Sequence, residues 1–435
     1  MNTILVLGAG FVAAPLVDYL HRKHYQITVA SYLLAESQAI ANDYHGVDAI
    51  ELDVSDNEAL SDAIRQHDMV VSFVPFIFHE RVAEACIAES RSLVTASYET
   101  EKMRSLDTAA KAAGVTIINE IGLDPGIDHL SARKIFDDIH KAGEKLESFV
   151  SWCGGIPAVS ANNNPLGYKF SWSPKSVLLA ALNDAKYINN GREQIIPAAE
   201  LLTTTEMVKI SDDLELEGYA NRDSTSYVAS YDIPEASKVL RGTLRYPGFC
   251  EIMQLFKGIG LLDQSDTITT WCNKPWADYI ASHLSASMAD FKSSLTEPQR
   301  NAMDYLDLLG ETHHIPEADT ILDAFCALLT EKLVYTETES DMVVMQHQFR
   351  SKNEAGDELL RTSTLVLEGD PDGFSAMAKT VGTPAAIMVD MIMTEEFTDT
   401  GVLLPMSAKF YEPILPRLAS EGIELSERVS TIRNN

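Results

Sequence analysis

The chain starts with Ile4-Leu5-Val6-Leu7, an apolar run that leads directly into Gly8-Ala9-Gly10-Phe11-Val12-Ala13-Ala14-Pro15. The run predicts a buried strand, and the G-x-G-x-x-A pattern predicts a tight turn that opens a helix. Gly8 permits the turn, Gly10 lets the backbone approach a pyrophosphate, and Ala13 allows close packing of helix on strand. The N–H groups at the helix N-terminus then face the phosphates. This stretch predicts a dinucleotide site, and a tight turn without a ligand is the alternative.

Short apolar strands alternate with helical patterns over the first part of the chain. We expect strands at residues 4–7, 26–31, 49–53, 69–74, 92–96 and 115–119. We expect helices at residues 12–24, 35–44, 57–66, 80–89 and 101–113. This alternation predicts an α/β fold with a doubly wound parallel sheet of the Rossmann type. The expected dinucleotide-binding domain spans residues 1–127 and is completed by a C-terminal segment at about 374–410, which includes a helix at 374–393.

The regular alternation of strands and helices ends after a helix expected at 128–141. Longer loops rich in Asn, Pro, Gly and Ser separate the strand-like pieces, and this predicts an α+β domain with a mixed or antiparallel sheet. Its strands are expected at residues 147–152, 239–245, 341–349 and 358–367. Residues 128–260 and 340–373 are the expected substrate-binding and dimerisation domain, and the more acidic residues 261–339 are an expected helical insert.

Acidic residues outnumber basic ones by 64 to 34, which gives a formal net charge of −30. This charge repels nucleic acid and anionic membrane surfaces, so neither is an expected partner. No apolar run is long enough to cross a membrane. No cationic segment precedes the first apolar run, so that run predicts a strand and not a signal peptide.

The five cysteines are odd in number and scattered, with no C-x-x-C pair. They argue against a disulfide framework and against a zinc site, and they favour a reducing, cytoplasmic location. His313-His314 and His347 lack the spacing of metal ligands, so no metal site is expected. The cysteines are Cys86, Cys153, Cys250, Cys272 and Cys326.

The carboxyl ends of the parallel strands are expected to line the cofactor cleft. Strand two ends at Ser31-Tyr32, where an acidic residue would favour NAD and a nearby Arg would favour NADP, and neither is present at that position. Ser31 can bond a hydroxyl or a phosphate, and Tyr32 can stack. Asp53-Val54 is a candidate adenine contact, with a helix cap or turn as the alternative for Asp53. Val74-Pro75-Phe76 is a candidate to pass beneath the ribose.

Strands five and six end in the segments expected near the nicotinamide. Strand five ends at Ser97-Tyr98, and strand six leads into a loop that two glycines and a proline constrain. Asp124 precedes Pro125, so it is biased to an extended conformation that puts its carboxylate at the strand tip. Its alternative role is that of a turn residue. Cys153 stands beside two glycines and is either accessible to a ligand or a small core residue.

Four cations stand out in this acidic chain. Arg presents a planar fork that suits a carboxylate. Any one of the four can instead pair with a surface carboxylate, but we expect at least one to bind a substrate carboxylate. They are Lys169, Arg222, Arg241 and Arg245.

Several longer runs resemble the saccharopine reductase family, that is, saccharopine dehydrogenase of the L-glutamate-forming type. They span nearly the whole chain, and the second and fourth are long enough to be specific. The runs are GAGFVAAP (8–15), NEIGLDPGIDH (119–129), WCGG (152–155), NPLGYKFSWS (164–173), IPEA (233–236), RGTLRY (241–246) and AKTVG (378–382).

The resemblance implies a Rossmann domain, a mixed-sheet domain that binds substrate and forms a homodimer, and a small helical insert. It implies condensation of glutamate with α-aminoadipate δ-semialdehyde, followed by hydride transfer from NADPH to the imine. The product would be saccharopine, on the α-aminoadipate route to lysine. NADP-dependent members have a basic residue beside Ser31, where this chain has Tyr32, so NAD stays open beside NADP.

The resemblance also implies the site residues. The implied substrate contacts are Ser97, Tyr98, Cys153, Arg222, Thr243, Leu244 and Arg245. The implied cofactor contacts are Ala9, Gly10, Phe11, Val12, Ser31, Tyr32, Asp53, Val54, Val74, Pro75, Phe76, Ser97, Leu123, Asp124, Pro125 and Ser173, together with Gly8 of the turn. Asp124, Tyr98 and Cys153 are the candidates for proton transfer.

Two other functions stay open at this point. One is a related imine reductase that acts on another amino acid or polyamine and another carbonyl compound. The other is a dinucleotide sensor without catalytic activity. The Arg-bearing runs and the Gly-Leu-Asp-Pro-Gly loop argue against a sensor, which needs no second polar cluster. They discriminate less well against another imine reductase, because a fold does not fix the substrate.

Overall fold

The structure is a computed structural model that describes residues 2–264 and 268–432. It divides into two compact units, of which the first covers residues 1–143 and 373–426. The second covers residues 144–372 and 427–435. The finer division, with residues 261–339 as a separate insert, stays a prediction.

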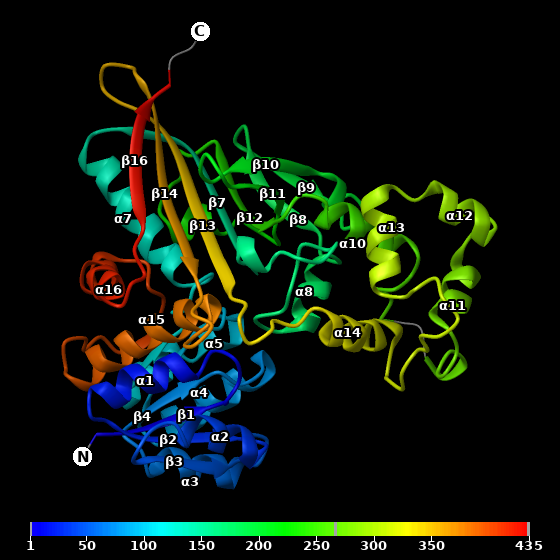
Figure 1. The fold of residues 1–435 in the computed structure, drawn as a ribbon. Helices are drawn as coiled ribbons and strands as arrows, with labels where there is room; N and C mark the ends of the chain where they lie inside the picture. The colour runs from blue at the N-terminus through cyan, green and yellow to red at the C-terminus, as the bar shows by residue number, and fades with distance from the viewer. Residues whose placement is uncertain (1, 265–267, 433–435) are drawn as a thin grey trace. The chain divides into compact units, whose positions relative to one another are not determined.

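The first unit contains a parallel sheet in the order β15-β6-β5-β4-β1-β2-β3 (Figure 1). Its strands are β1 (Thr3–Leu7), β2 (Gln26–Ser31), β3 (Val47–Glu51), β4 (Met69–Ser72), β5 (Ser92–Thr95), β6 (Thr116–Ile118) and β15 (Gly401–Leu403). The order 3-2-1-4-5-6 is that of the Rossmann fold, so the expected fold class is confirmed. Strand β15 pairs in parallel with β6 and extends this sheet at one edge.

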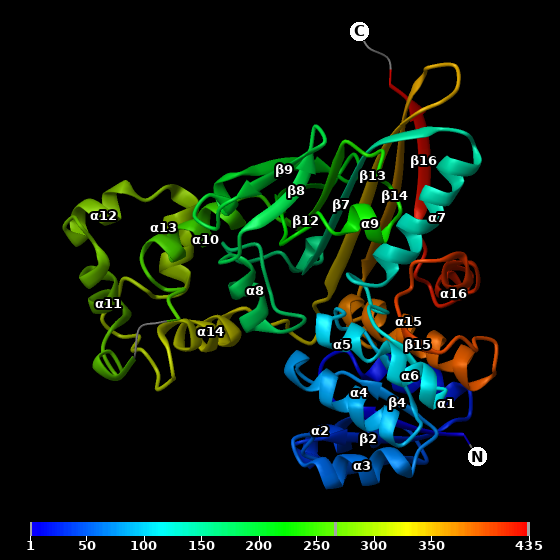
Figure 2. The ribbon, with the colours of Figure 1, turned by 180° about the vertical axis from the view of Figure 1, so that it is seen from behind.

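Helices cover both faces of this sheet (Figures 1 and 2). Helices α1 and α15 pack together on one side, while α3, α4 and α6 pack against one another on the other. The helices of this unit are α1 (Ala14–Arg22), α2 (Leu34–Ala41), α3 (Asn57–Arg65), α4 (His79–Ala88), α5 (Glu101–Ser105), α6 (Asp107–Ala113), α7 (Ile127–Lys141), α15 (Ala376–Met393) and α16 (Ala408–Ser420).

Two helix predictions were wrong in detail. The helix expected at 101–113 is two helices, α5 and α6, that meet at Leu106. The Leu106 N–H bonds to the Met103 carbonyl three residues back, so the α-helical ladder is interrupted there. The first helix begins at Ala14 and not at residue 12, because the Ala13 N–H first closes a turn onto the Gly10 carbonyl.

The second unit is built on a mixed sheet in the order β10-β11-β12-β7-β13-β14-β16, with β8 and β9 joined through β12 (Figure 1). Strand β7 is central, because it pairs in parallel with β12 and antiparallel with β13. This arrangement confirms the expected mixed sheet. The strands are β7 (Lys145–Pro157), β8 (Ala185–Asn189), β9 (Arg192–Ile196), β10 (Thr205–Lys209), β11 (Glu215–Ala220), β12 (Lys238–Arg245), β13 (Asp341–Lys352), β14 (Glu358–Glu368) and β16 (Ser426–Thr431).

Helices follow the strands of this unit and include those expected beyond residue 260. They are α8 (Pro174–Ala180), α9 (Tyr227–Ser230), α10 (Phe249–Gly258), α11 (Trp276–His283), α12 (Met288–Ser294), α13 (Glu297–Tyr305) and α14 (Ile321–Lys332). One apolar cluster includes side chains from both the sheet and these helices, among them Trp152 of β7 and Trp276 of α11. Phe256 of α10 and Phe325 of α14 join them edge to face, with ring centroids 5.1 Å apart.

Candidate functional site

The glycine-rich turn of the first unit has the geometry that a dinucleotide needs. Gly8 has φ of +100°, and a Cβ there would lie 2.8 Å from the Phe73 carbonyl oxygen, so no other residue fits. A Cβ on Gly10 would meet no protein atom within 4 Å. The space in front of Gly10 is therefore open, and the turn fits the approach of a pyrophosphate to the backbone.

Helix α15 closes onto this turn from the C-terminal part of the same unit. A Cβ on Gly382 would lie 2.7 Å from the Val12 carbonyl oxygen, so a glycine allows the close contact. Ala13 is fully buried beneath the turn. Because helix α15 packs so closely on the glycine-rich turn, the run 378–382 needs a glycine at its last position.

Apolar side chains are exposed where the strands of the parallel sheet end. Phe11 after β1 is 72% exposed, Tyr32 after β2 is 69% exposed and Phe76 after β4 is 74% exposed. Leu33 and Ile77 beside them are also exposed. Grouped exposure of large apolar side chains is typical of a surface that a ligand covers. Val54, Val74 and Pro75, also predicted cofactor contacts, follow the ends of β3 and β4.

Polar groups at the same strand ends have specific partners. The Ser31 hydroxyl donates to the Glu36 Oε2 atom at 2.6 Å. Asp53 accepts the Ser55 N–H at 2.8 Å, and the hydrogen bonds from Ser55 lower the pKa of that carboxyl. Asp53 therefore makes the contact of a turn residue, and its role beside the adenine stays a prediction.

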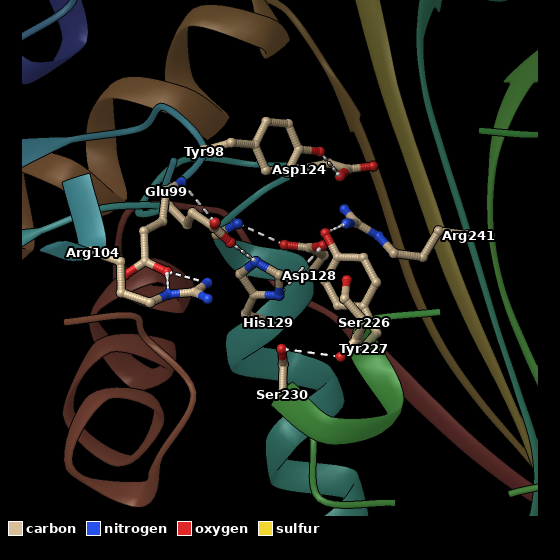
Figure 3. A network of polar contacts seen from close by, with 12 residues as sticks. Tyr98, Glu99, Arg104, Asp124, Asp128, His129, Ser226, Tyr227, Ser230 and Arg241 are labelled. Carbon is tan, nitrogen blue, oxygen red and sulfur yellow. Dashed lines mark hydrogen bonds and ion pairs between the residues drawn. The ribbon is translucent and has the colours of Figure 1, made fainter. Parts of the chain in front are cut away.

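The structure brings together two of the three predicted proton-transfer residues. The Tyr98 hydroxyl donates to the Asp124 Oδ1 atom at 3.3 Å (Figure 3). The loop that carries Asp124 is tight, because the Gly122 N–H bonds to the Pro125 carbonyl at 2.9 Å. The Asp124–Pro125 peptide bond is cis. Ser97 lies beside Tyr98, and its carbonyl accepts the Glu120 N–H.

A buried acid–histidine pair lies behind this loop, and its role was not predicted from the sequence. The His129 Nε2 atom lies 2.8 Å from Glu120 Oε2. The other Glu120 oxygen accepts the Glu99 N–H at 2.9 Å. Asp128 accepts the Gly126 N–H at 2.6 Å. Both paired side chains belong to the run 119–129, so their place in a long specific motif was the available signal.

The predicted substrate residues of the second unit lie on adjoining strands. Cys153 of β7 pairs in register with Thr243 of β12, and Leu244 and Arg245 follow on β12. Cys153 is buried within the sheet. Ser173 lies at the start of α8, exposed, with its hydroxyl 2.9 Å from that of Ser176.

Arg245 is a buried cation without a carboxylate partner among the residues that the structure describes. It is 3% exposed, and its Nη1 donates to the Leu244 carbonyl at 2.7 Å. The guanidinium carbon lies 5.0 Å from the centre of the Tyr168 ring. Glu217, the cross-strand neighbour of Arg245, instead accepts the Cys250 N–H. A buried charge in such a position is stabilised by an anion, because desolvation without a partner is costly.

The other three predicted cations differ from Arg245. The Lys169 Nζ atom lies 2.5 Å from Glu339 Oε2, and this lysine lowers the pKa of Glu339 to about 2. Arg241 donates to the Tyr227 hydroxyl, with its guanidinium 4.4 Å from the Tyr227 ring centre (Figure 3). Arg222 is exposed and has φ of +52°. Lys169 is therefore paired with a carboxylate of the protein itself, and its role toward a substrate stays a prediction.

Within the described residues, no group of three or more His, Cys, Asp or Glu side chains is placed to hold a metal ion. The described helices include none that is both long and apolar enough to cross a membrane.

Two family models match the chain in succession. The model described as "Saccharopine dehydrogenase NADP binding domain" matches residues 4–118, and "Saccharopine dehydrogenase C-terminal domain" matches residues 122–423. The chain belongs to the saccharopine dehydrogenase family. The resemblance inferred from the sequence runs is thereby confirmed, and the glycine-rich turn lies within the part that matches an NADP-binding domain.

Relatives in this family match the chain from end to end. A protein of Pyricularia oryzae named "Saccharopine dehydrogenase [NADP(+), L-glutamate-forming]" is 39% identical, over 98% of this chain and 99% of the relative. The protein of the same name from Saccharomyces cerevisiae is also 39% identical, with the same coverage. The solved apo structure of the yeast enzyme matches this structure with a TM-score of 0.92 at 38% identity. The match covers 99% of this chain and 100% of the yeast chain. The saccharopine dehydrogenase fold is therefore shown along nearly the full length.

Proposed function

We propose that the protein condenses L-glutamate with α-aminoadipate δ-semialdehyde and reduces the resulting imine with NADPH to give saccharopine. The full-length match to enzymes named for this reaction supports the proposal. The observation of this chain's own structure that carries it furthest is Arg245, a buried guanidinium that lacks a carboxylate partner among the described residues. Glutamate and the semialdehyde each carry at least one carboxylate that such a group can bind.

The reaction has two balanced steps. The glutamate amine adds to the aldehyde, and loss of one water from the carbinolamine gives the imine. The dinucleotide, when bound, supplies a hydride to the imine carbon, and a proton on nitrogen completes the secondary amine. The reverse steps oxidise saccharopine, so the reaction is reversible.

The residues of the chain serve binding, orientation and proton transfer. Arg245, with Arg222, Thr243 and Leu244, is proposed to hold the substrate. Tyr98 and Asp124, joined by a hydrogen bond, are proposed to move protons at the carbinolamine, with Cys153 as a third candidate. The ordinary pKa values of Tyr and Asp, about 10 and 4, both lie far from neutral pH, so burial or a neighbouring charge must assist either group in exchanging a proton. Orientation of a preformed imine supplies a further part of the rate.

We further propose a cytoplasmic homodimer in the lysine biosynthesis route. The described cysteines form no disulfide, as is usual in a reducing compartment. Because the protein carries a large negative charge, small anionic amino acids need a local cation, and Arg245 supplies one.

The test is the oxidation of NADPH and NADH by the purified protein, with glutamate plus the semialdehyde against a panel of other amines and carbonyl compounds. The proposal expects glutamate and the semialdehyde to give the highest kcat/KM. A polyamine or another amino acid that reacts faster would favour a different imine reductase. Oxidation with none of the pairs would favour a dinucleotide sensor.

A further inference from the structure

The end of strand β2 carries a carboxylate where a Rossmann fold selects its cofactor. Ser31 is the last residue of β2, and Glu36 lies in the first turn of α2, which follows at once. The Ser31 hydroxyl donates to Glu36 Oε2 at 2.6 Å. In this fold an acidic residue at that place bonds the ribose hydroxyls of NAD, whereas an Arg accommodates the 2′-phosphate of NADP. This hydrogen bond holds the Glu36 carboxylate beside the end of β2, the part of the fold where the acidic residue of an NAD site lies.

The surrounding segment is acidic throughout. Residues 24–64 contain eight Asp and Glu residues and no Lys or Arg. Ser31 pairs in register with Glu51, the last residue of β3, and Asp53 follows after one residue. A phosphate monoester carries a charge of about −1.5 to −2 near neutral pH, so these carboxylates repel the 2′-phosphate.

The cations nearest in sequence to this segment have partners elsewhere. Arg22 and Lys23 lie at the C-terminal end of α1, at the opposite edge of the sheet, and pair with Glu421 and Asp390 at 2.8 and 3.2 Å. Arg65, at the C-terminal end of α3, pairs with Glu89 at 2.9 Å. None of the three is placed to neutralise a phosphate at the end of β2.

Arg81 lies near the start of α4, at the edge of the sheet where the parallel strands end and the cofactor is expected to bind. Its Nη1 donates to the carbonyl of Ser55, which lies on the loop between β3 and α3. Its charge acts on Asp53 and helps to lower the pKa of that carboxyl. Arg81 is therefore held at the end of β3 and not at the end of β2.

Tyr32 is placed to offer cofactor binding that does not depend on the phosphate. The side chain follows Ser31 directly and is 69% exposed, and Leu33 beside it is 54% exposed. An exposed aromatic ring offers a flat face to an adenine, and the adenine is the same in both cofactors. Adenosine binding through Tyr32 is thus independent of the 2′ substituent.

We propose that this protein accepts NADH alongside NADPH, because the end of β2 contacts the ribose through Ser31 and Glu36 and, among the residues that the structure describes, has no cation for the 2′-phosphate. The inference rests on the proposed function only in that a nicotinamide dinucleotide is the hydride donor. The chain then binds both cofactors, although its residues 4–118 match a family model described as an NADP binding domain.

The experiment measures dissociation constants of NADH and NADPH for the purified full-length protein by fluorescence titration, without amino-acid substrates. The expected preference for NADPH is below about tenfold, that is, below about 1.4 kcal/mol. A preference for NADPH of about tenfold or more contradicts the proposal. Because no substrate is present, equal binding of both cofactors supports it even if saccharopine is not formed. Binding of neither cofactor overturns both this inference and the proposed function.

Substitutions test which residue sets the preference between NADH and NADPH. Glu36→Gln keeps an oxygen for the Ser31 hydroxyl but removes the charge, so we expect it to tighten NADPH by about fivefold and to change NADH less than about twofold. Asp43→Asn, exposed just beyond the other end of α2, is the matched control and should change neither. An equal effect of the two variants would contradict a role for Glu36. If Arg81→Gln weakens NADPH about tenfold and leaves NADH unchanged, Arg81 holds the phosphate and the proposal is wrong.

Discussion

The imidazole of His129 lies 2.8 Å from the carboxylate of Glu120, and both side chains are buried behind the loop that carries Asp124. The second oxygen of Glu120 accepts the N–H of Glu99, the residue after Tyr98. The Glu120 carboxylate therefore links the two segments that present the predicted proton-transfer residues. Arg104, in turn, holds the Glu99 side chain at 2.7 Å.

Glu120 is accordingly expected to act as a positioning residue. Glu120→Gln keeps the shape but weakens the bond to His129, so Tyr98 and Asp124 lose their fixed relative geometry. We expect kcat to fall by about tenfold while KM for glutamate changes little, as loss of one charge-assisted bond predicts. Steady-state kinetics across pH, with thermal unfolding alongside, checks this. Glu101→Gln, exposed on α5, is the matched control. An unaltered kcat and pH profile in Glu120→Gln would remove Glu120 from the mechanism.

Asp124 is expected to accept or supply a proton during turnover. Asp124→Asn retains the loop and a hydrogen-bond partner for Tyr98, but it cannot exchange a proton in the same way. We expect kcat to fall by about a hundredfold, within the range of general acid–base catalysis, with dinucleotide binding retained. Tyr98→Phe should act in the same direction. If Asp124→Asn folds and turns over at the normal rate, Asp124 is only a turn residue.

Arg245 is expected to bind a substrate carboxylate. Arg245→Met removes a buried charge that has no carboxylate partner in the described structure, so it should not lower the free energy of unfolding. KM for glutamate or for the semialdehyde should rise by about tenfold to a hundredfold, and kcat should change less. Arg245→Lys should recover part of the affinity. Kinetics of the folded Met variant with both KM values unchanged would exclude the role.

Lys169 provides the contrasting case in the same unit. Its buried ammonium pairs with Glu339 at 2.5 Å, so Lys169→Met leaves a carboxylate without its cation. We expect a loss of about 3 kcal/mol in the free energy of unfolding and little change in either KM. Denaturant unfolding beside the kinetics measures both quantities. Raised KM values with undiminished stability would mean that Lys169, and not Arg245, serves the substrate.

His79 should make the stability of the protein depend on pH. Burial lowers the pKa of this imidazole from 6.5 to about 4, and its Nδ1 lies 3.0 Å from the Ser72 hydroxyl. Between these values the unfolded chain binds a proton that the folded chain does not, so stability is lost as pH falls from 6.5 towards 4. The full contribution is about 3 kcal/mol. His79→Gln should flatten the pH profile of unfolding, whereas His45→Gln, at an exposed position, should not. Equal profiles for wild type and His79→Gln would contradict the assignment.

Local sequence patterns predicted the parallel sheet well. The strand before the glycine-rich turn and the strand that ends at Ser31 have the predicted carboxyl ends, because apolar runs and turn residues specify such boundaries locally. Strand β15 was missed, since its three residues, Gly401–Leu403, are too short to show a pattern. The break between α5 and α6 at Leu106 was also missed, because no Gly or Pro marks it.

Long-range pairing limited the prediction of the site. Lys169 and Arg245 are both cations within specific runs, and only a carboxylate 170 residues away distinguishes them, since Glu339 neutralises Lys169. The bond between Ser31 and Glu36 depends on the rotamers of two side chains, which the sequence does not reveal. The sequence runs therefore identified these residues as candidates, but their partners in the folded protein determine whether each side chain is available to a ligand.

The measurement that tests the central claim most directly is isotope transfer with product identification. NADPH that carries deuterium at both C4 positions of the nicotinamide is incubated with the protein, glutamate and α-aminoadipate δ-semialdehyde, and the product is analysed by mass spectrometry. The account predicts saccharopine with one deuterium on the carbon that was the aldehyde carbon, formed only when glutamate is present. Deuterated alcohol formed from the semialdehyde without glutamate, or no deuterium transfer at all, would contradict it.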